Sequence, residues 1–469
     1  MFSAESKWKL PEELKTLTQL QYLRVINSYW NEFPLIITEL SSLQRIEGFR
    51  HKLTTLPPKI NRLKNLEYLN LSHGSLTHLP AEIGTLNCLK NLNLYANEIT
   101  HLPAEIGQLT QLQTLDLNDN ELKELPQEMG QLQNLKKLIC SNNSSVKVPV
   151  ALLAGLENLQ YLELLDCGLR VFDLGDATFN KLEKLYLRSN WLSEFNVKPG
   201  QFPELQVLYL SNNHLEFFPK GLGQLGKLRI LHLSSNDGQF DKIPEEIKHL
   251  KNLEELYLFE NRFEVFSMSI GQLPLLQILD MNCCQFKEVP ENIGNLKKLV
   301  KLILYNNHIK ALPSTIGQLQ SLEELDLRNN SLTELPPEIG QLSNLKILSL
   351  SGNQLTRLPP EIGKLESLVE LSLSDNQLVE LPPEISQLKN LKILRLNGNQ
   401  LQELPALIGN LPRLDHLDLT KNQLTILPIT LSQYMISSTQ SVYLKQNPIS
   451  KDLKQKLKVY LQNCQVVFE

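Results

Sequence analysis

The chain has 469 residues, 42% of them hydrophobic, and a formal net charge of −5 at pH 7. It therefore has no bulk positive field that would favour nucleic acid, and it has no run of roughly 18 apolar residues that would predict a transmembrane helix. Its first residues, MFSAESKWKLPEEL, lack the apolar core of a secretory signal. We expect a cytoplasmic protein, and the alternative is a secreted or surface-exposed protein without a recognisable signal peptide.

One pattern repeats along almost the whole chain. Its clearest units open at Leu322, Leu345 and Leu368, a step of 23 residues. Each unit follows L-x-x-L-x-L-x-x-N-x-L-x-x-L-P-x-E-I-G-x-L, and we number its places from the first leucine. A fixed period of this length indicates a solenoid, because one unit cannot bury its own apolar side chains whereas a stack of units can.

Each place in the unit has a physical reason. Places 4 to 6, such as Leu325, Asp326 and Leu327, alternate apolar and polar residues, which predicts a short strand. The asparagine at place 9 can pair with backbone groups where the chain leaves the strand. The proline at place 15 then blocks any return to strand structure.

The unit resembles the leucine-rich repeat, in the L-P-x-E-I-G-x-L subtype found in bacterial members and in the intracellular Ras-group-related members of plants and animals. The resemblance covers nearly all of the chain. It implies an α/β solenoid of horseshoe shape, with a parallel β-sheet on the concave side and irregular, 3-10 or helical segments on the convex side. It also implies a binding or scaffolding role.

The predicted elements begin with a half-repeat over residues 1–19, which includes Trp8 and caps the solenoid. Residues 20–449 then form the solenoid itself, with about 19 strands in all. The first three units carry Ser28, His51 and Gly74 at place 9, so we expect weaker bonding there. The remaining place-9 asparagines are expected to form a structural ladder: Asn97, Asn120, Asn143, Asn190, Asn213, Asn236, Asn261, Asn307, Asn330, Asn353, Asn376, Asn399, Asn422 and Asn447.

The middle of the chain departs from the pattern in two ways. Asp173 and Asn196 replace the place-15 proline, so the return paths of those two units should differ. The unit that opens at Leu228 is longer, with extra residues at 237–241, which we interpret as a plain loop because they lack the spacing of a calcium site. After the last strand, residues 450–469 form a capping helix, with Lys451 to Gln462 amphipathic.

Catalytic and metal-binding motifs are absent from the sequence. No phosphate-binding loop, dinucleotide fingerprint, zinc-protease motif or nucleophile elbow occurs. The six cysteines lack metal-type spacing, and we interpret them as reduced structural thiols. Some bacterial leucine-rich-repeat effectors carry a separate ubiquitin-ligase domain, but no such domain surrounds Cys464 here. The sequence therefore predicts no enzyme, cofactor or metal.

The variable places on the predicted sheet face carry an aromatic run. Side chains at place 5 of successive units should stand side by side, about 4.8 Å apart. One interpretation is that tyrosines simply stabilise the sheet. The other is a recognition patch, because interfaces favour Tyr, Trp and Arg. On that hypothesis the ligand-binding residues are Tyr186, Trp191, Tyr209, His232, Tyr257, Phe259 and Tyr305.

The sequence predicts a non-enzymatic scaffold that binds a partner protein through the concave face. One alternative is an exported bacterial effector or surface protein that binds a host protein, since regular PxEIGQL units look bacterial. Another is glycan binding, because stacked tyrosines and a tryptophan can hold sugar rings. A regulator of a signalling enzyme is also compatible with the fold. We expect a monomer without a nucleic-acid partner.

Overall fold

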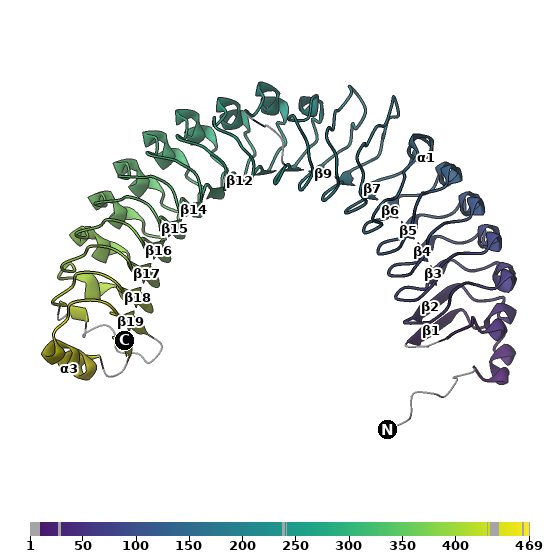
Figure 1. Cartoon of the computed structure of the whole chain (residues 1–469), viewed down its shortest axis with the longest axis horizontal. Coiled ribbons are helices and arrows are strands. Elements are labelled where there is room, and N and C mark those ends of the chain that lie inside the picture. The colour runs from purple at the N-terminus through teal and green to yellow at the C-terminus, as the bar shows by residue number, and fades with distance from the viewer. Residues whose placement is uncertain are drawn as a thin grey trace. The chain divides into compact units, whose positions relative to one another are not determined.

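The computed structural model describes residues 10–26, 30–236, 240, 242–428, 430–431, 440–461 and 464–468. The chain consists of two compact units, unit 1 (Met1–Leu228) and unit 2 (Arg229–Glu469). In each unit a parallel sheet lines the inner side of a curve, and short helical turns form the outer side (Figure 1). The predicted solenoid class, with one strand per repeat, is confirmed.

The sheet of unit 1 pairs strands that follow one another in sequence. Leu69, Leu92 and Leu115 face one another across three of these strands, and all three side chains are buried. Residues on either side of each buried leucine point to the exposed face of the sheet, on the inner side of the curve. The strands are β1 (Tyr22–Ile26), β2 (Arg45–Phe49), β3 (Tyr68–Asn70), β4 (Asn91–Asn93), β5 (Thr114–Asp116), β6 (Lys137–Ile139), β7 (Tyr161–Glu163), β8 (Lys184–Tyr186) and β9 (Val207–Tyr209).

The sheet of unit 2 has the same parallel register, with Leu325 on one strand facing Leu348 on the next. Most strands cover places 3 to 5 of the unit, one residue earlier than the sequence predicts. Backbone bonding continues past the strand end, because the Leu327 N–H at place 6 donates to Ser349 O at 2.8 Å. The strands are β10 (Ile230–His232), β11 (Glu255–Tyr257), β12 (Ile278–Asp280), β13 (Lys301–Ile303), β14 (Glu324–Asp326), β15 (Ile347–Ser349), β16 (Glu370–Ser372), β17 (Ile393–Arg395), β18 (His416–Asp418), β19 (Ser441–Tyr443) and β20 (Gln465–Val467).

Short 3-10 turns follow the place-15 prolines. Pro336 has φ −68° and caps one such turn, and Ile339 within the turn is fully buried. A Cβ at Gly340 would collide with the carbonyl oxygen of Glu361 in the next unit, so the close packing of turns requires glycine. In unit 1 the turns are η1 (Glu12–Thr16), η2 (Leu35–Glu39), η3 (Pro58–Arg62), η4 (Ala81–Thr85), η5 (Ala104–Gln108), η6 (Gln127–Gln131) and η7 (Leu222–Gln224), with the α-helix α1 (Val150–Gly155). In unit 2 they are η8 (Glu245–His249), η9 (Met268–Gln272), η10 (Glu291–Asn295), η11 (Ser314–Gln318), η12 (Pro337–Gln341), η13 (Pro360–Lys364), η14 (Pro383–Gln387) and η15 (Ile408–Asn410).

The two return paths with Asp173 and Asn196 at place 15 differ from the others, as the sequence predicts. Ser267 also replaces this proline, but there the 3-10 turn η9 is kept and the Ser267 side chain caps it. Residues 164–183 and 187–206 lie entirely within the described part of the chain and contain no helical turn. Phenylalanine side chains fill the core behind these return paths. The rings of Phe179 and Phe202 stack with their centroids 5.5 Å apart. Both rings are buried, so the core stays closed where the turn is lost.

The place-9 asparagines bond in one repeated pattern, shown by Asn353. Its Nδ2 donates to the carbonyl oxygens of Leu327 and Leu350, both at 2.9 Å, and its Oδ1 accepts from Leu332 N at 3.0 Å. Each amide therefore ties the chain turn of its own unit to the unit before. Cys167 at place 9 makes only part of this pattern, its thiol lying 3.1 Å from Cys140 O.

The early units differ from the prediction of weak bonding. His51 is buried and bonds to backbone groups of its own and the following unit. Ser28, the capping residues 1–9 and the insertion residues 237–239 and 241 lie outside the described residues. Phe240 of the insertion is buried and stacks on Phe263 at 5.7 Å.

The C-terminal end contains the predicted helix and one strand that the sequence analysis did not predict. Helix α3 (Lys451–Tyr460) starts at Ser450, whose hydroxyl accepts from Leu453 N at 3.2 Å. The side chain of Tyr460 lies outside the described residues. Strand β20 follows, and its Val466 pairs with Val442 on β19. The strand after the helix continues the sheet beyond the last recognisable repeat.

Candidate functional site

The exposed, concave face of the unit 1 sheet carries three tyrosines on adjacent strands. Tyr161, Tyr186 and Tyr209 lie on β7, β8 and β9, with ring centroids 5.2 Å and 5.0 Å apart along the run. The interplanar angles of 40° and 38° are tilted, so each ring leans on the next. The Lys137 ammonium lies 4.5 Å from the centroid of the Tyr161 ring and adds a cation–π contact. Tyr161 extends the predicted pair Tyr186 and Tyr209 to a run of three.

Two of these tyrosine hydroxyls have perturbed acidity. Burial and the bonded carboxylate of Glu163 raise the pKa of Tyr161, whose hydroxyl donates to that carboxylate. Burial and the neighbouring Tyr209 also raise the pKa of Tyr186. Both hydroxyls therefore stay protonated at neutral pH, and that of Tyr161 donates a hydrogen bond.

Trp191 lies in the segment that follows β8. Its side chain is 58% exposed, and its ring packs on His214 with centroids 4.9 Å apart. Packing on the second ring restricts the conformational freedom of this exposed indole.

The exposed, concave face of the unit 2 sheet carries a second aromatic group. The rings of His232 and Tyr257 on β10 and β11 stack at 4.0 Å with an interplanar angle of 13°. Phe259 meets His232 edge to face at 6.3 Å, and the Tyr257 hydroxyl donates to Glu255 Oε2 at 2.9 Å. The structure thus brings these three predicted residues together within unit 2.

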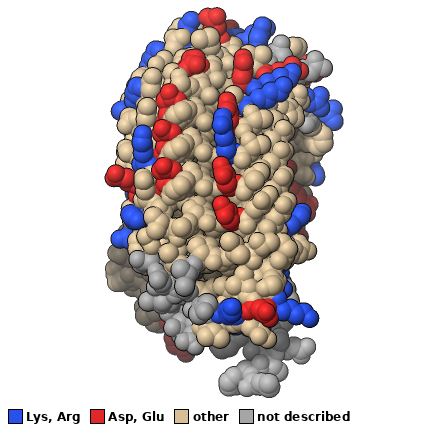
Figure 2. Space-filling view, turned by 90° about the vertical axis from the view of Figure 1, so that its left-hand side faces the viewer, with Lys and Arg blue, Asp and Glu red and all other residues tan. Residues whose placement is uncertain are grey.

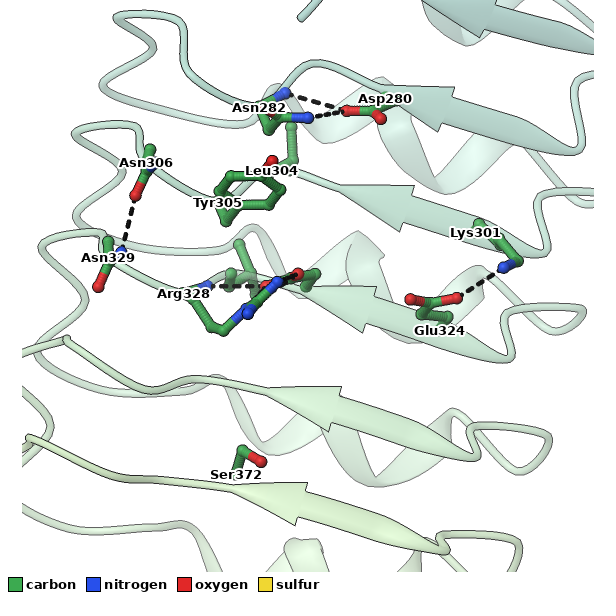
Figure 3. A network of polar contacts seen from close by, with 12 residues as sticks. Asp280, Asn282, Lys301, Leu304, Tyr305, Asn306, Glu324, Arg328, Asn329 and Ser372 are labelled. Atoms are coloured by element: carbon green, nitrogen blue, oxygen red, sulfur yellow. Dashed lines mark hydrogen bonds and ion pairs between the residues drawn. The ribbon is translucent and has the colours of Figure 1, made fainter. Parts of the chain in front are cut away.

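Tyr305 lies further along the same face of unit 2, beside the ion pair of Arg328 and Asp326 (Figure 3). The Arg328 guanidinium is 5.2 Å from the centroid of the Tyr305 ring, and its Nε donates to Asp326 Oδ1 at 2.9 Å. The Asp326 side chain is almost fully buried. Tyr305 therefore forms one wall of a site that the chain fills with its own guanidinium.

Asp280 and Asn282 lie on β12 and just after it, in the same view (Figure 3). The Asp280 carboxylate accepts from the Asn282 backbone N–H at 3.3 Å and from its Nδ2 at 2.5 Å. Burial raises the pKa of Asp280, against the effect of these two bonds. The sequence places Asp280 in the place-5 row but gives it no role, because only the structure shows that none of the described lysines, arginines and histidines pairs with it.

A further cluster at the start of unit 1 was missed from the sequence. The carboxylate of Glu47 is buried and accepts from Arg45 Nε at 2.7 Å, and Arg24 Nε lies 3.2 Å from it. The Arg45 guanidinium also lies 3.9 Å from the centroid of the Tyr68 ring. The place-3 and place-5 residues of these irregular units could have indicated this cluster of arginine and tyrosine.

The other side of unit 2 carries charges in rows, as Figure 2 shows, with uncharged bands between them. The rows arise because each place recurs at a constant step. A groove of about 690 Å³ follows the loops of four units there. Its floor is leucine and proline, including Pro382, Pro383 and Pro405, and Glu380, Glu384 and Glu403 lie along it.

The His, Cys, Asp and Glu side chains of the described residues are spread over different repeats. Among them, no group of three or more His, Cys, Asp or Glu side chains could hold a metal ion. Burial raises the pKa of Cys167 and of Cys284 to about 12, so neither thiol ionises at neutral pH. Within the described chain, no helix combines the length and the apolar character needed to cross a membrane.

Comparison with known proteins agrees with the repeat. The family described as leucine-rich repeat region matches residues 77–188, 258–328 and 291–377, and the family described as leucine rich repeat matches residues 170–237 and 366–424. None of the curated proteins compared with the chain matches it significantly.

Solved structures match over nearly the full length. The Leptospira interrogans leucine-rich repeat protein LIC12759 is 32% identical, with a TM-score of 0.64, over 99% of this chain and 100% of that one. A TDR receptor is 28% identical, with a TM-score of 0.72, over 94% and 78% of the two chains. The plant peptide hormone receptor RGFR1, solved in complex with RGF2, is 25% identical, with a TM-score of 0.65, over 96% and 80%. The chain is a member of the leucine-rich repeat family.

Proposed function

We propose that the chain is a non-enzymatic scaffold that binds a partner protein through the concave, solvent-exposed face of its parallel sheet. The observation that carries this proposal is the set of ring contacts on that face, Tyr161 to Tyr209 in unit 1 and His232 to Phe259 in unit 2. Rigid aromatic side chains bind with little loss of entropy and are enriched in interface hot spots. The similarity to RGFR1, whose structure contains RGF2, is consistent with this role.

The finer assignments made from the sequence remain part of the proposal. They are the L-P-x-E-I-G-x-L subtype, the monomeric and cytoplasmic state, and the caps at residues 1–19 and 450–469 around a solenoid at 20–449. Turn η1 before β1 and helix α3 after β19 support the two caps. Export to bind a host protein is the alternative, and the similarity to a Leptospira protein is compatible with a bacterial source.

Protein capture tests the proposed function. The wild type, the double variant Tyr209→Ala/Tyr257→Ala and the control Phe217→Ala are used as crosslinking baits. Phe217 is 68% exposed at place 13, away from the sheet face, so it controls for loss of an exposed ring. We expect the wild type and the control to capture the same protein and the double variant to lose it, with unchanged circular dichroism in all three.

Two results would contradict the proposal. Capture of the same protein by all three baits would place recognition on another surface and leave the tyrosines as sheet packing. Release of the captured material by free sugars would favour the glycan alternative, for which the exposed Trp191 ring is the suitable surface.

A further inference from the structure

Two rows of side chains cross the sheet face of unit 2, at places 5 and 7. Tyr257 pairs with Asp280, and Asp280 pairs with Ile303, across β11, β12 and β13. Backbone bonds fix the second row. The Glu260 N–H donates to Asn282 O at 3.0 Å, and the Cys283 N–H donates to Tyr305 O at 2.9 Å. Asn282 therefore lies between Phe259 and Tyr305 in this row. We call these six residues the cradle: Tyr257, Asp280, Ile303, Phe259, Asn282 and Tyr305.

The floor of the cradle is polar and its walls are apolar. Asp280 and Asn282 form the floor, with Tyr257 and Phe259 on one side and Tyr305 on the other. Only 4% of Asn282 is exposed, and its Oδ1 has no hydrogen-bond partner among the described residues. Buried polar atoms are normally paired, so this unpaired acceptor beside the partly exposed Asp280 marks a place where the described chain leaves polar groups unsatisfied.

The Asp280 carboxylate also lacks a counter-ion. Within the described residues no lysine, arginine or histidine forms an ion pair with it, and Asn282 is its hydrogen-bond partner. The charged groups that act on Asp280 are the carboxylates of Asp326 and Glu324, which oppose its ionisation. A partly buried carboxylate with no cation is unfavourable unless a ligand supplies one.

Unit 1 has the same two residues at the same places, and there the chain satisfies them itself. Asp116 accepts from the Asn118 N–H at 3.1 Å, as Asp280 does from Asn282. The Asn118 Oδ1, however, accepts from Ser141 N at 2.6 Å, and the Lys137 ammonium acts favourably on the Asp116 charge. Of the two Asp and Asn pairs, only Asp280 and Asn282 therefore lack both a nearby cation and a donor to the amide oxygen among the described residues.

The next rows of unit 2 show which cation fits such a site. Asp326 occupies place 5 two units further on, and Arg328 fills the space above it. The guanidinium bonds to the Asp326 carboxylate at 2.9 Å and lies 5.2 Å from the centroid of the Tyr305 ring. A planar guanidinium can donate to a carboxylate while it stacks on an aromatic ring.

We propose that the cradle receives an arginine side chain of the bound protein, with its guanidinium donating to the partly exposed Asp280 carboxylate between the rings of Tyr257 and Tyr305. The inference rests on the proposed protein-binding function of the sheet face and names one chemical feature of the partner. It assigns Asp280 a role in specificity, because a carboxylate at this point rejects acidic and neutral side chains.

A small probe tests the cradle without a partner protein. N-acetyl-arginine methylamide is titrated into the full chain at low salt, and the signals of isotope-labelled tyrosines are followed by NMR. N-acetyl-citrulline methylamide, which has nearly the same shape without the charge, is the matched ligand. We expect saturable millimolar binding of the arginine probe and about tenfold weaker binding of citrulline, since charge-assisted hydrogen bonds are roughly twice as strong as neutral ones.

Two isosteric variants complete the test. Asp280→Asn should weaken the arginine probe about tenfold, whereas Asp116→Asn should bind it as the wild type does. The comparison of arginine with citrulline on the wild type needs no variant, so a folding defect in Asp280→Asn leaves the proposal testable. Equal binding of the two probes, no saturable binding at millimolar concentrations, or unchanged binding by Asp280→Asn would each overturn the inference.

The outcome is separable from that of the capture experiment. If capture depends on Tyr209 and Tyr257 but the arginine probe fails, the cradle is wrong and the scaffold function stands. If the probe binds as expected but no bait captures a protein, the chemistry of the cradle is right and its assignment to a protein partner is wrong.

Discussion

His51 fills the space that Gly74, in the next unit, leaves empty at place 9. A Cβ at Gly74 would collide with the His51 ring. The ring nitrogens of His51 bond to Leu71 O at 3.0 Å and to Leu53 N at 3.2 Å. An asparagine at residue 74 would bond to the same two groups, because Asn353 makes the equivalent bonds to Leu350 O and Leu332 N.

This relationship predicts a rescue by double substitution. His51→Ala should destabilise the chain by about 1–3 kcal/mol, because it leaves buried backbone groups without partners. Gly74→Asn alone should also destabilise it, because the new side chain meets the ring. His51→Ala/Gly74→Asn should recover most of the loss, since the asparagine then restores the ordinary pattern. Chemical denaturation of the wild type, the two single variants and the double variant measures the coupling free energy between the two positions. A double variant less stable than both single variants would show that an asparagine at residue 74 does not replace the bonds of His51.

The same residue predicts a pH dependence. A carbonyl accepts and an N–H donates, so His51 must be neutral with its proton on Nε2. Burial lowers the pKa of His51 in the folded chain, against the effect of its bond to Leu71. Below about pH 6.5 the unfolded chain therefore binds a proton that the folded chain does not, and stability falls as the pH drops towards the folded pKa, by at most about 1.4 kcal/mol per pH unit. His51→Ala/Gly74→Asn should lose less stability than the wild type between about pH 7 and pH 5; equal losses would contradict a neutral His51.

The asparagine ladder and the leucine core should respond to substitution by different amounts. Asn353→Ala should cost about 1–3 kcal/mol through unpaired backbone groups, and Leu350→Ala about 2–5 kcal/mol through the cavity it opens. The exposed Asn344, which bonds to Gln320 O at 2.7 Å, is the control. Asn344→Ala should change the free energy of unfolding by no more than about 0.5 kcal/mol. Denaturation curves in which all three variants coincide would show that the inward assignments are wrong.

Asp280 should reduce stability at neutral pH. Burial raises its pKa in the folded chain, so folding is less favourable when the carboxylate is ionised than when it is protonated. Asp280→Asn should therefore raise the free energy of unfolding at neutral pH, by less than about 1 kcal/mol because solvent screens the charge. The gain should shrink as the pH falls through the folded pKa and disappear below the unfolded pKa of about 4. A loss of stability at neutral pH would mean that the chain already pairs this charge.

The cysteines should differ in reactivity. Cys88 is exposed, whereas Cys140, Cys167 and Cys284 are buried and have raised pKa values. Only a thiolate that a reagent can reach is modified. Brief treatment of the native chain with a maleimide, read by mass spectrometry, should label Cys88 and leave the three buried thiols unmodified until denaturant is added. Early modification of Cys167 or Cys284 would show that these units open locally.

The repeat made the solenoid predictable, because leucine at places 1, 4 and 6 defines the buried face whatever else the unit contains. Strand β20 was missed because Gln465 to Val467 lacks that pattern and is recognisable only by its pairing with β19. The bonding of His51 was also missed, since the prediction considered each unit alone and the compensation involves two. Whether a described cation pairs with Asp280 depends on which side chains neighbouring strands present, a property that no single repeat encodes.

The pairing of His51 with Gly74 also limits how this gene could have gained or lost repeats. Units with asparagine at place 9 are interchangeable. Deletion of residues 345–367 would bring Asn376 next to another unit that also carries asparagine at place 9, so its bonding pattern would be kept. Deletion of residues 66–88 would instead bring the place-9 asparagine Asn97 next to His51, in the space that the imidazole occupies. The units that open at Leu43 and Leu66 must therefore be inherited together, whereas the regular units can be duplicated or removed one at a time.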